Sequence, residues 1–301
     1  MRTRFIASGD GKRLRVGSFD AAPGTSPHGF CTILDGQTEF LEKYEEVAGE
    51  LAARGFAGAI LDWRGQGGSE RLIADPLKAH VRDFSEYDAD LAALLEQVVR
   101  PETDRPPLAL AHSMGGHILL RTLRRDPQVF SAAVMTAPML RTATRGYPRW
   151  LVRAICFAQA RAGHGNDWVW GMRDRDPLRV PFDDNFVTSD RARYARAQNF
   201  LGDNPGLRLA GPSWSWLEGA YRSMAAMEAR GFAEAITTPC LVFGAGRDRI
   251  VETGAVRDFA RRLPRGRYVE IPEAEHEILM ENDSIRGHFW REFDAFVAGA
   301  V

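Results

Sequence analysis

A serine stands where a predicted strand meets a predicted helix. The stretch "LALAHSMGGHIL" (residues 108–119) opens with an apolar run, reaches Ser113 and continues into a helical pattern. A serine in so tight a strand-to-helix turn exposes its hydroxyl and can act as a nucleophile, provided that the residues two positions away are small. Ala111 and Gly115 meet this condition, although Ala111 replaces the usual first glycine of G-x-S-x-G. The alternative is a serine that simply caps the helix N-terminus.

A serine hydroxyl is a weak nucleophile at neutral pH, so it needs a base and an acid that orients the base. In the fold that uses this turn, the acid and then the histidine follow the serine along the chain. Only His276 and His288 lie far enough downstream. His276 follows a predicted strand at 267–271, at the sheet edge expected for the serine, whereas His288 falls inside a predicted helix. We therefore predict His276 as the base.

The acid is expected after the strand that precedes the histidine's strand. In "CLVFGAGRDRIV" the predicted strand ends at Gly244 and Asp248 follows in the turn, one helix before His276. This separation of one strand-helix unit places both side chains at adjacent strand ends, so we predict Asp248 as the acid. Glu252 is the alternative, although its place at a helix start is typical of a capping residue.

Two backbone N–H groups are expected to stabilise the oxyanion that forms during attack on a carbonyl. One is the N–H of Met114, the residue after the nucleophile. The other is predicted in "LDGQTEFLEKY", where Gly36 makes the turn and the N–H of Gln37 points toward the oxyanion. An ordinary strand-helix loop is the alternative interpretation of this segment.

The elements that must position these residues alternate between apolar strands and helices with a 3.6-residue period. This alternation predicts an α/β fold with a mostly parallel, doubly wound sheet. A hairpin is expected around Gly9–Asp10–Gly11. The strands are predicted at 29–36, 56–62, 108–111, 130–138, 239–246 and 267–274, and the helices at 38–55, 83–99, 114–125, 253–262 and 285–298.

The alternation fails between residues 140 and 235. This arginine-rich segment contains five of the seven tryptophans, and its apolar stretches "WLVRAICFAQA" and "SWLEGAYRSMAAMEA" indicate helices. We predict a core from residues 1–139 and 236–301 with a helical cap inserted at 140–235. The cap aromatics either line a pocket or build the core of the cap itself.

Composition excludes several other classes of protein. The 301 residues carry a formal net charge of −1, which gives no general attraction to nucleic acid. The three cysteines, Cys31, Cys156 and Cys240, form no C-x-x-C pair, so we expect buried thiols and no disulfide framework. We predict no metal and no cofactor. Without a signal-peptide pattern or a membrane-span pattern, we expect a cytoplasmic location, with a peripheral membrane contact through the cap left open.

Five stretches together resemble α/β-hydrolases of the monoacylglycerol lipase and bacterial lysophospholipase (L2-like) group: "DGQTEFLEKY", "LDWRGQGGSE", "AHSMGGHI", "GAGRDRIV" and "AEHEILME". The resemblance implies the α/β-hydrolase fold and a serine carboxylic ester hydrolase that forms an acyl-enzyme on Ser113. It also implies an ester of one long acyl chain as substrate, either a lysophospholipid or a monoacylglycerol. Asp35-Gly36 departs from the His-Gly that the group often has, and Ala111 departs at the turn, but neither removes a backbone donor.

Other activities share the same three catalytic residue types. A thioesterase, a C–C bond hydrolase and a cofactor-free haloperoxidase all remain open, because they differ mainly in the cap and the pocket. The serine at the turn excludes epoxide hydrolases and dehalogenases, which use an aspartate there. A non-catalytic binding module is the alternative from a different class of function.

Overall fold

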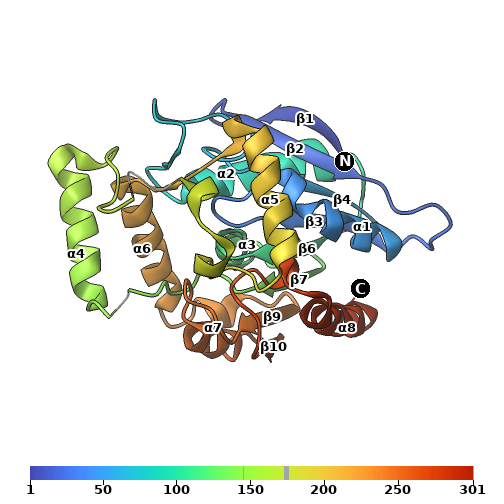
Figure 1. Ribbon diagram of the computed structural model, residues 1–301. Helices are drawn as coiled ribbons and strands as arrows, with labels where there is room; N and C mark the ends of the chain where they lie inside the picture. The colour runs from blue at the N-terminus through green and yellow to red at the C-terminus, as the bar shows by residue number, and fades with distance from the viewer. Residues whose placement is uncertain (145, 173–175, 301) are drawn as a thin grey trace.

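An eight-stranded sheet runs through the centre of the protein, of which the structure describes residues 1–144, 146–172 and 176–300. In this computed structural model the strands lie in the order β1-β2-β4-β3-β6-β7-β9-β10 (Figure 1). β1 and β2 form the predicted hairpin, β2 is antiparallel to β4, and the other pairs are parallel. The strands are β1 (Arg2–Ala7), β2 (Arg13–Phe19), β3 (Gly29–Leu34), β4 (Phe56–Leu61), β6 (Leu108–His112), β7 (Ala132–Thr136), β9 (Cys240–Ala245) and β10 (Gly266–Ile271). The α/β prediction is confirmed.

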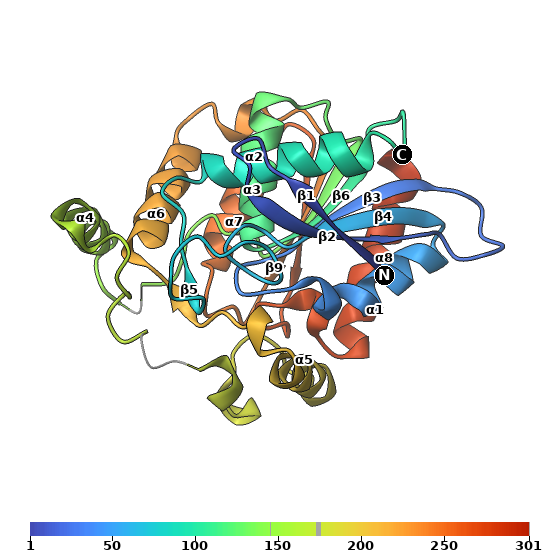
Figure 2. The same cartoon turned by 90° about the horizontal axis from the view of Figure 1, so that it is seen from above.

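Helices cover both faces of the sheet. α1 and α8 lie on one face, and α2, α3 and α7 lie on the other (Figure 2). The bounds are α1 (Glu45–Ala53), α2 (Ser85–Leu94) with a π-helical continuation (Leu95–Val99), α3 (Met114–Arg125), α4 (Arg149–Gln159), α5 (Arg191–Asp203), α6 (Trp214–Glu228), α7 (Thr253–Ala260) and α8 (Asp283–Ala300).

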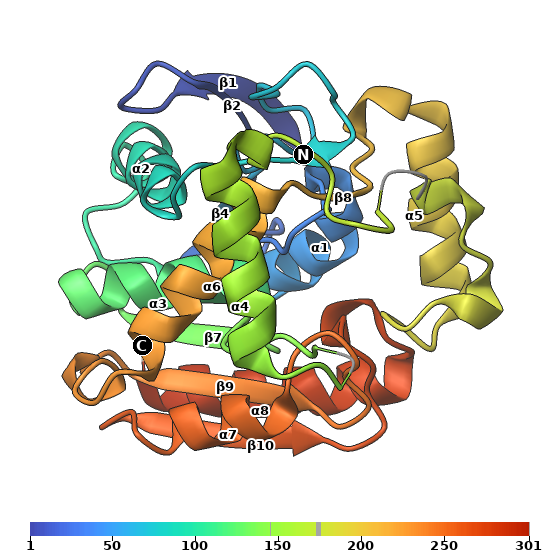
Figure 3. The same cartoon turned by 90° about the vertical axis from the view of Figure 1, so that its left-hand side faces the viewer.

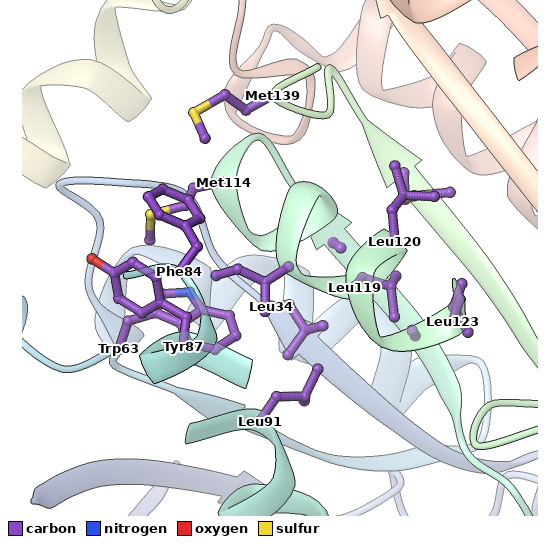
Figure 4. Close-up of a cluster of buried hydrophobic side chains, with 14 of the residues drawn as sticks. Leu34, Trp63, Phe84, Tyr87, Leu91, Met114, Leu119, Leu120, Leu123 and Met139 are labelled. Atoms are coloured by element: carbon purple, nitrogen blue, oxygen red, sulfur yellow. The ribbon is translucent and has the colours of Figure 1, made fainter. Parts of the chain in front are cut away.

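The central strands are apolar on both faces because each face packs against helices. Ile33 of β3 joins the cluster under α1 and α8, whereas its neighbour Leu34 joins the cluster under α2 and α3. In the second cluster, Leu34 lies near Trp63, Tyr87 and Met114 (Figure 4). Burial on both faces explains why these strands read as continuous apolar runs rather than as an alternation.

The helix predicted at 38–55 begins later than its periodicity indicates. Thr38 has a φ of 68°, Phe40 is extended, and a 3-10 turn at Leu41–Tyr44 precedes α1. The N–H of Leu41 donates to Oδ1 of Asp62 at 2.9 Å. A tertiary hydrogen bond therefore fixes this segment in a conformation that its local pattern does not favour.

The segment predicted as the cap carries α4, α5 and α6. The helices predicted from its two apolar stretches are confirmed as α4 and α6, which pack against each other, while α5 lies apart from both (Figure 3). A short pairing of β5 (Lys78–Ala79) with β8 (Gly211–Pro212) joins the segment to a loop of the core. The predicted domain boundaries themselves stay a prediction.

All three cysteines are free and buried, as predicted. Within the described ranges, no group of three or more His, Cys, Asp or Glu side chains is arranged to hold a metal ion. None of the helices in the described part of the chain is both long enough and apolar enough to cross a membrane.

Candidate active site

Ser113 occupies a strained backbone position between β6 and α3. Its φ of 48° and ψ of −111° are unusual for a residue with a side chain, and such strain persists only where the surroundings fix it. Its N–H donates to the carbonyl of Thr136 at 3.0 Å, and its carbonyl accepts from the N–H groups of His117 and Met139. Ser113 is therefore not a simple helix cap, since its side chain makes no cap hydrogen bond.

Gly115 is required by the close approach of α3 to the end of β3. A Cβ atom at this position would lie 2.2 Å from the carbonyl oxygen of Leu34 and 2.5 Å from that of Asp35. Both contacts are with backbone, so no side chain can move aside to relieve them. Ala111 is buried at the end of β6, and its methyl group is accommodated there.

The structure brings the predicted acid, base and nucleophile together in one line. Nε2 of His276 lies 3.0 Å from Oγ of Ser113, and Nδ1 of His276 lies 2.6 Å from Oδ2 of Asp248. The side chains of His276 and Asp248 are only 5% and 1% exposed. This is the geometry that a serine nucleophile, a general base and an orienting acid require.

Asp248 is held as an ionised carboxylate. Its Oδ1 accepts the N–H groups of Ile250 and Val251, each at 2.8 Å, while its Oδ2 faces His276. Burial alone would raise the pKa of Asp248, but His276 and these two donors keep that pKa below its usual value.

The loops that carry Asp248 and His276 are fixed to each other and to the segment before α5. The N–H of Arg247 donates to the carbonyl of Ala274 at 2.9 Å. Buried Glu281 accepts the N–H of Glu275 at 2.8 Å and the N–H of Ser189 at 3.1 Å. Sequence reasoning missed Glu281, because nothing in the local pattern links a glutamate in a later loop to the orientation of His276.

The loop predicted to supply an oxyanion donor is positioned by the "DWRGQGGS" segment. Trp63 Nε1 donates to the carbonyl of Asp35 at 3.0 Å, and Gln66 Nε2 donates to the carbonyl of Gly36 at 2.8 Å. No turn, loop or cap hydrogen bond between described residues uses the N–H of Gln37 or of Met114. Both groups remain available as donors, and their role in an oxyanion hole stays a prediction.

His276 is the histidine that contacts Ser113 Oγ in the described part of the chain, and the other candidate residues have different partners or surroundings. Glu252 precedes α7, makes no cap hydrogen bond and lies 3.5 Å from Arg141. His288 is a half-exposed residue of α8. His112 is buried, its Nδ1 lies 3.0 Å from Oγ1 of Thr136, and burial lowers its pKa to about 4, so it remains neutral beside the His276 ring.

A buried group of charged side chains lies beside the site, and sequence reasoning did not anticipate it. Lys43 contacts Glu39 and Glu277, and Asp35 is fully buried with no hydrogen-bond partner for either carboxyl oxygen among the described residues. Burial raises the pKa of Asp35 well above its ordinary value, and the Glu39 charge adds to this. The replacement of the His-Gly pair by Asp35-Gly36 thus places a fully buried carboxyl group, whose pKa is raised, next to Gly36 in the predicted oxyanion loop.

Comparison with known proteins gives matches over most of the chain. The model of the family "Serine aminopeptidase, S33" (Hydrolase_4) matches residues 25–283. "Lysophospholipase L2" of Escherichia coli K12 is 37% identical over 262 residues, covering 84% of this chain and 76% of the relative. "Monoacylglycerol lipase" of Mycolicibacterium smegmatis is 33% identical over 38% of this chain and 40% of its own length.

Solved structures show the same fold. A soluble variant of monoglyceride lipase from Saccharomyces cerevisiae, crystallised with a substrate analogue, aligns with a TM-score of 0.75 at 18% identity over 100% of this chain and 96% of its own. A carboxyl esterase from Bacillus coagulans gives a TM-score of 0.79 at 17% identity, over 99% of this chain and 98% of its own. The chain belongs to the α/β-hydrolase family described as "Serine aminopeptidase, S33".

Proposed function

We propose that the chain is a serine carboxylic ester hydrolase that cleaves lysophospholipids or monoacylglycerols through an acyl-enzyme on Ser113. The observation that carries this proposal is the unbroken line of hydrogen bonds from Asp248 through His276 to Ser113 at a strained strand-to-helix turn. No metal or cofactor is needed for this chemistry, because the three side chains and two backbone donors supply every step.

In the first half of the reaction, Nε2 of His276 takes the proton of Ser113 Oγ while that oxygen attacks the ester carbonyl. The N–H groups of Met114 and Gln37 donate to the oxyanion of the tetrahedral intermediate. The Asp248 carboxylate holds Nδ1–H of His276 and stabilises the imidazolium that forms. His276 then returns the proton to the departing alcohol oxygen, and the acyl group stays on Ser113.

In the second half, water replaces the alcohol. His276 removes a proton from the water as its oxygen attacks the acyl-enzyme, and the same two N–H groups hold the second oxyanion. Collapse of this intermediate releases the fatty acid and returns the proton to Ser113. The net reaction consumes one ester and one water and yields one alcohol and one acid.

The substrate class is supported by the relatives rather than by the three catalytic side chains, which would serve any acyl ester. The lysophospholipase L2 of Escherichia coli aligns over 84% of this chain at 37% identity. A yeast monoglyceride lipase aligns over the full chain. Lysophospholipases and monoglyceride lipases both act on esters of a single acyl chain, so we assign that class to this chain.

We also propose that residues 140–235 form the cap and that α4 contacts a lipid surface. One face of α4 and of its π-helical continuation (Ala160–His164) carries Trp150, Arg153, Phe157 and Arg161. The side chains of Trp150 and Phe157 are 71% and 53% exposed. Exposed aromatics with arginines on a helix face suit the boundary between lipid headgroups and acyl chains. α4 also packs on α6, Cys156 of α4 is buried, and the aromatic face borders a hollow that Glu218 and Tyr221 of α6 line on the other side.

The test is Ser113→Ala with two readouts. Turnover of p-nitrophenyl esters should be lost, and a fluorophosphonate probe should label the wild type but not the variant, while the thermal unfolding temperature stays unchanged. Appreciable turnover in the variant would contradict the assignment of Ser113. Failure of the probe to label the wild type would favour a non-catalytic binding module.

A substrate panel then tests the class of ester. kcat/KM is measured for a lysophosphatidylcholine, a monoacylglycerol, a short-chain ester, an acyl thioester and an aminoacyl anilide, the last because the family description names an aminopeptidase. We expect the two single-chain lipids to give the highest values. A clear preference for the thioester or the anilide would replace the proposed substrate class.

A further inference from the structure

The side chain of Lys43 connects two loops that are far apart in the sequence. Its ammonium lies 2.8 Å from Oε1 of Glu39 and 2.6 Å from Oε1 of Glu277. Glu39 belongs to the loop after β3 and Glu277 to the loop after β10. β6, β7 and β9 separate these strands in the sheet, so the contact reaches across the edge at which β6 delivers Ser113.

On the β3 side, Lys43 holds the carboxylate that shapes the predicted oxyanion loop. The other oxygen of Glu39, Oε2, accepts the N–H of Gly36 at 2.5 Å and the hydroxyl of Tyr44 at 2.6 Å. Gly36 immediately precedes Gln37, so the direction of the Gly36 N–H constrains the peptide that follows. A Cβ atom on Gly36 would lie 2.8 Å from Glu39 Oε2 and 3.0 Å from Cδ2 of His112, so a larger residue there would have to displace one of these side chains.

On the β10 side, Lys43 holds the residue next to the base. Glu277 directly follows His276, and its N–H donates to the carbonyl of Val187 at 2.7 Å. Glu281 binds the backbone on the other side of His276, through the N–H of Glu275. The residues on both sides of His276 are therefore held by hydrogen bonds. The ion pairs of Lys43 connect this loop to the loop after β3.

Glu39 and Glu277 need the ammonium group of Lys43 in order to remain ionised and close to each other. The exposed fractions of the side chains are 13% for Lys43, 3% for Glu39 and 13% for Glu277. Burial raises the pKa of Glu277, and the Glu39 charge raises it further, while Lys43 opposes both. Burial would also raise the pKa of Glu39, but the charge of Lys43 and the hydrogen bond from Tyr44 help to hold that pKa below its usual value. Removing the ammonium would leave the two carboxyl groups without their shared counter-ion, so one of them would have to take up a proton or move away from the other.

We propose that Lys43 is a positioning residue that fixes the oxyanion donor of Gln37 relative to the base His276. This inference rests on the proposed function, since it assigns Lys43 a role in that reaction. Lys43 touches neither the substrate nor the reacting atoms. It acts through Glu39 on one loop and through Glu277 on the other.

The rate should be sensitive to this contact because the two groups act on the same tetrahedral intermediate. A displacement of about 1 Å between groups that must act together can cost about 100-fold in rate, even when substrate binding is unaffected. The loss of a positioning contact should therefore lower kcat and leave KM nearly constant. A loss that only reduced folding would instead lower the amount of active enzyme.

The experiment compares Lys43→Met with Lys12→Met. Lys12 forms a salt bridge with Glu70 on the surface, so its variant controls for the loss of one ammonium group. Active sites are counted with a fluorophosphonate, and kcat is calculated per labelled site for a short soluble ester. We expect kcat per site of Lys43→Met to fall about 10- to 100-fold with KM within about twofold of wild type, and Lys12→Met to match wild type. A kcat per site equal to wild type in Lys43→Met would overturn the inference.

Glu277→Gln provides a second test, which also applies if Lys43→Met fails to fold. This variant keeps an oxygen that can accept from Lys43 but removes the charge, so we expect a smaller fall in kcat per site. In the double variant that combines Lys43→Met with Glu277→Gln, kcat per site should lie within about twofold of that of Lys43→Met alone, because both changes break the same contact. Additive losses, or an unchanged kcat in Glu277→Gln, would contradict the link. Retained turnover in Ser113→Ala would contradict the proposed function instead, so the two failures can be told apart.

Discussion

Ser113 is 7% exposed at the end of β6, whereas Trp150 on α4 is 71% exposed. The side chains around Ser113 find their partners within the chain: Asp248 binds His276, and Lys43 binds two glutamates. The aromatic face of α4 has its large side chains directed to solvent, with Arg161 lying 5.2 Å from the Phe157 ring as a local contact.

This difference indicates that the two regions serve different steps. Buried groups that are held by hydrogen bonds and ion pairs to one another keep their orientation. Such fixed groups suit a site where charge develops during the reaction. Exposed aromatic side chains flanked by arginines lose their contact with water only when another surface covers them. Changes at the sheet edge should therefore affect turnover of every ester, whereas changes on α4 should affect only substrate presented in lipid.

The largest effect is expected at the acid. Asp248→Asn should lower kcat by about 10⁴-fold on soluble and lipid esters alike, because an amide favours the wrong tautomer of the histidine. The measurement is kcat for a short ester and for lysophosphatidylcholine, with circular dichroism as the control for folding. Loss confined to the lipid substrate would break the proposed division between the two regions.

A methyl group added at Gly115 should be poorly tolerated at the strand-to-helix turn. Gly115→Ala places a Cβ atom against the Leu34 and Asp35 carbonyl oxygens and should lower the free energy of unfolding by about 1–3 kcal/mol. Gly49→Ala is the matched control, because α1 leaves open space around that Cβ and alanine favours a helix. Urea denaturation measures the free energy of unfolding of both variants. Equal values would show that the strand-to-helix turn is less tightly packed around Gly115 than the contacts indicate.

On α4, the expected effect is limited to lipid presentation. Replacing Trp150 and Phe157 together by serine should weaken binding to anionic vesicles by about 10-fold or more, because each aromatic anchor contributes roughly 1 kcal/mol or more when buried. kcat/KM for a short soluble ester should not change. Phe5→Ser is the control, since Phe5 is an aromatic 50% exposed on β1, away from the cap. Vesicle co-sedimentation separates these outcomes, and equal losses in both variants would remove the special role of α4.

The smallest effect is expected at the alternative acid. Glu252→Gln should keep kcat within about twofold of wild type, because its surface contact with Arg141 contributes little. Steady-state kinetics on the short ester provide the measurement. A loss as large as that in Asp248→Asn would transfer the orienting role to Glu252.

The sequence was sufficient for the parts of the fold that depend on local pattern. α3 begins and ends at the predicted residues, because an apolar strand, a serine and two glycines define its start and Asp126-Pro127 its end. The placement of Ser113, Asp248 and His276 at one edge of the sheet could also be predicted, since parallel strands bring their carboxyl ends to one edge and the fold gives the order of the three residues. The late start of α1 did not follow, because the N–H of Leu41 donates a hydrogen bond to the distant carboxylate of Asp62.

The supporting contacts of the site could not be predicted for the same reason. Lys43 and Glu277 are far apart in the sequence, and each looks like an ordinary charged residue of a helix start or a loop. Glu281 and Gln66 likewise act through partners that no periodicity connects. In the sequence, Asp35 is only a departure from a motif, and its complete burial depends on residues such as Trp63 and Glu39 that the fold brings beside it.

The burial of the three cysteines has a practical consequence for following α4. Burial raises the pKa of Cys156 and of Cys240 to about 12 and that of Cys31 further, so almost no thiolate forms at neutral pH. Native thiols should therefore react slowly with maleimides. In a Trp150→Cys variant, a maleimide fluorophore would therefore label the exposed new thiol selectively, and the three native cysteines would not have to be removed. The fluorophore would report the approach of α4 to a vesicle.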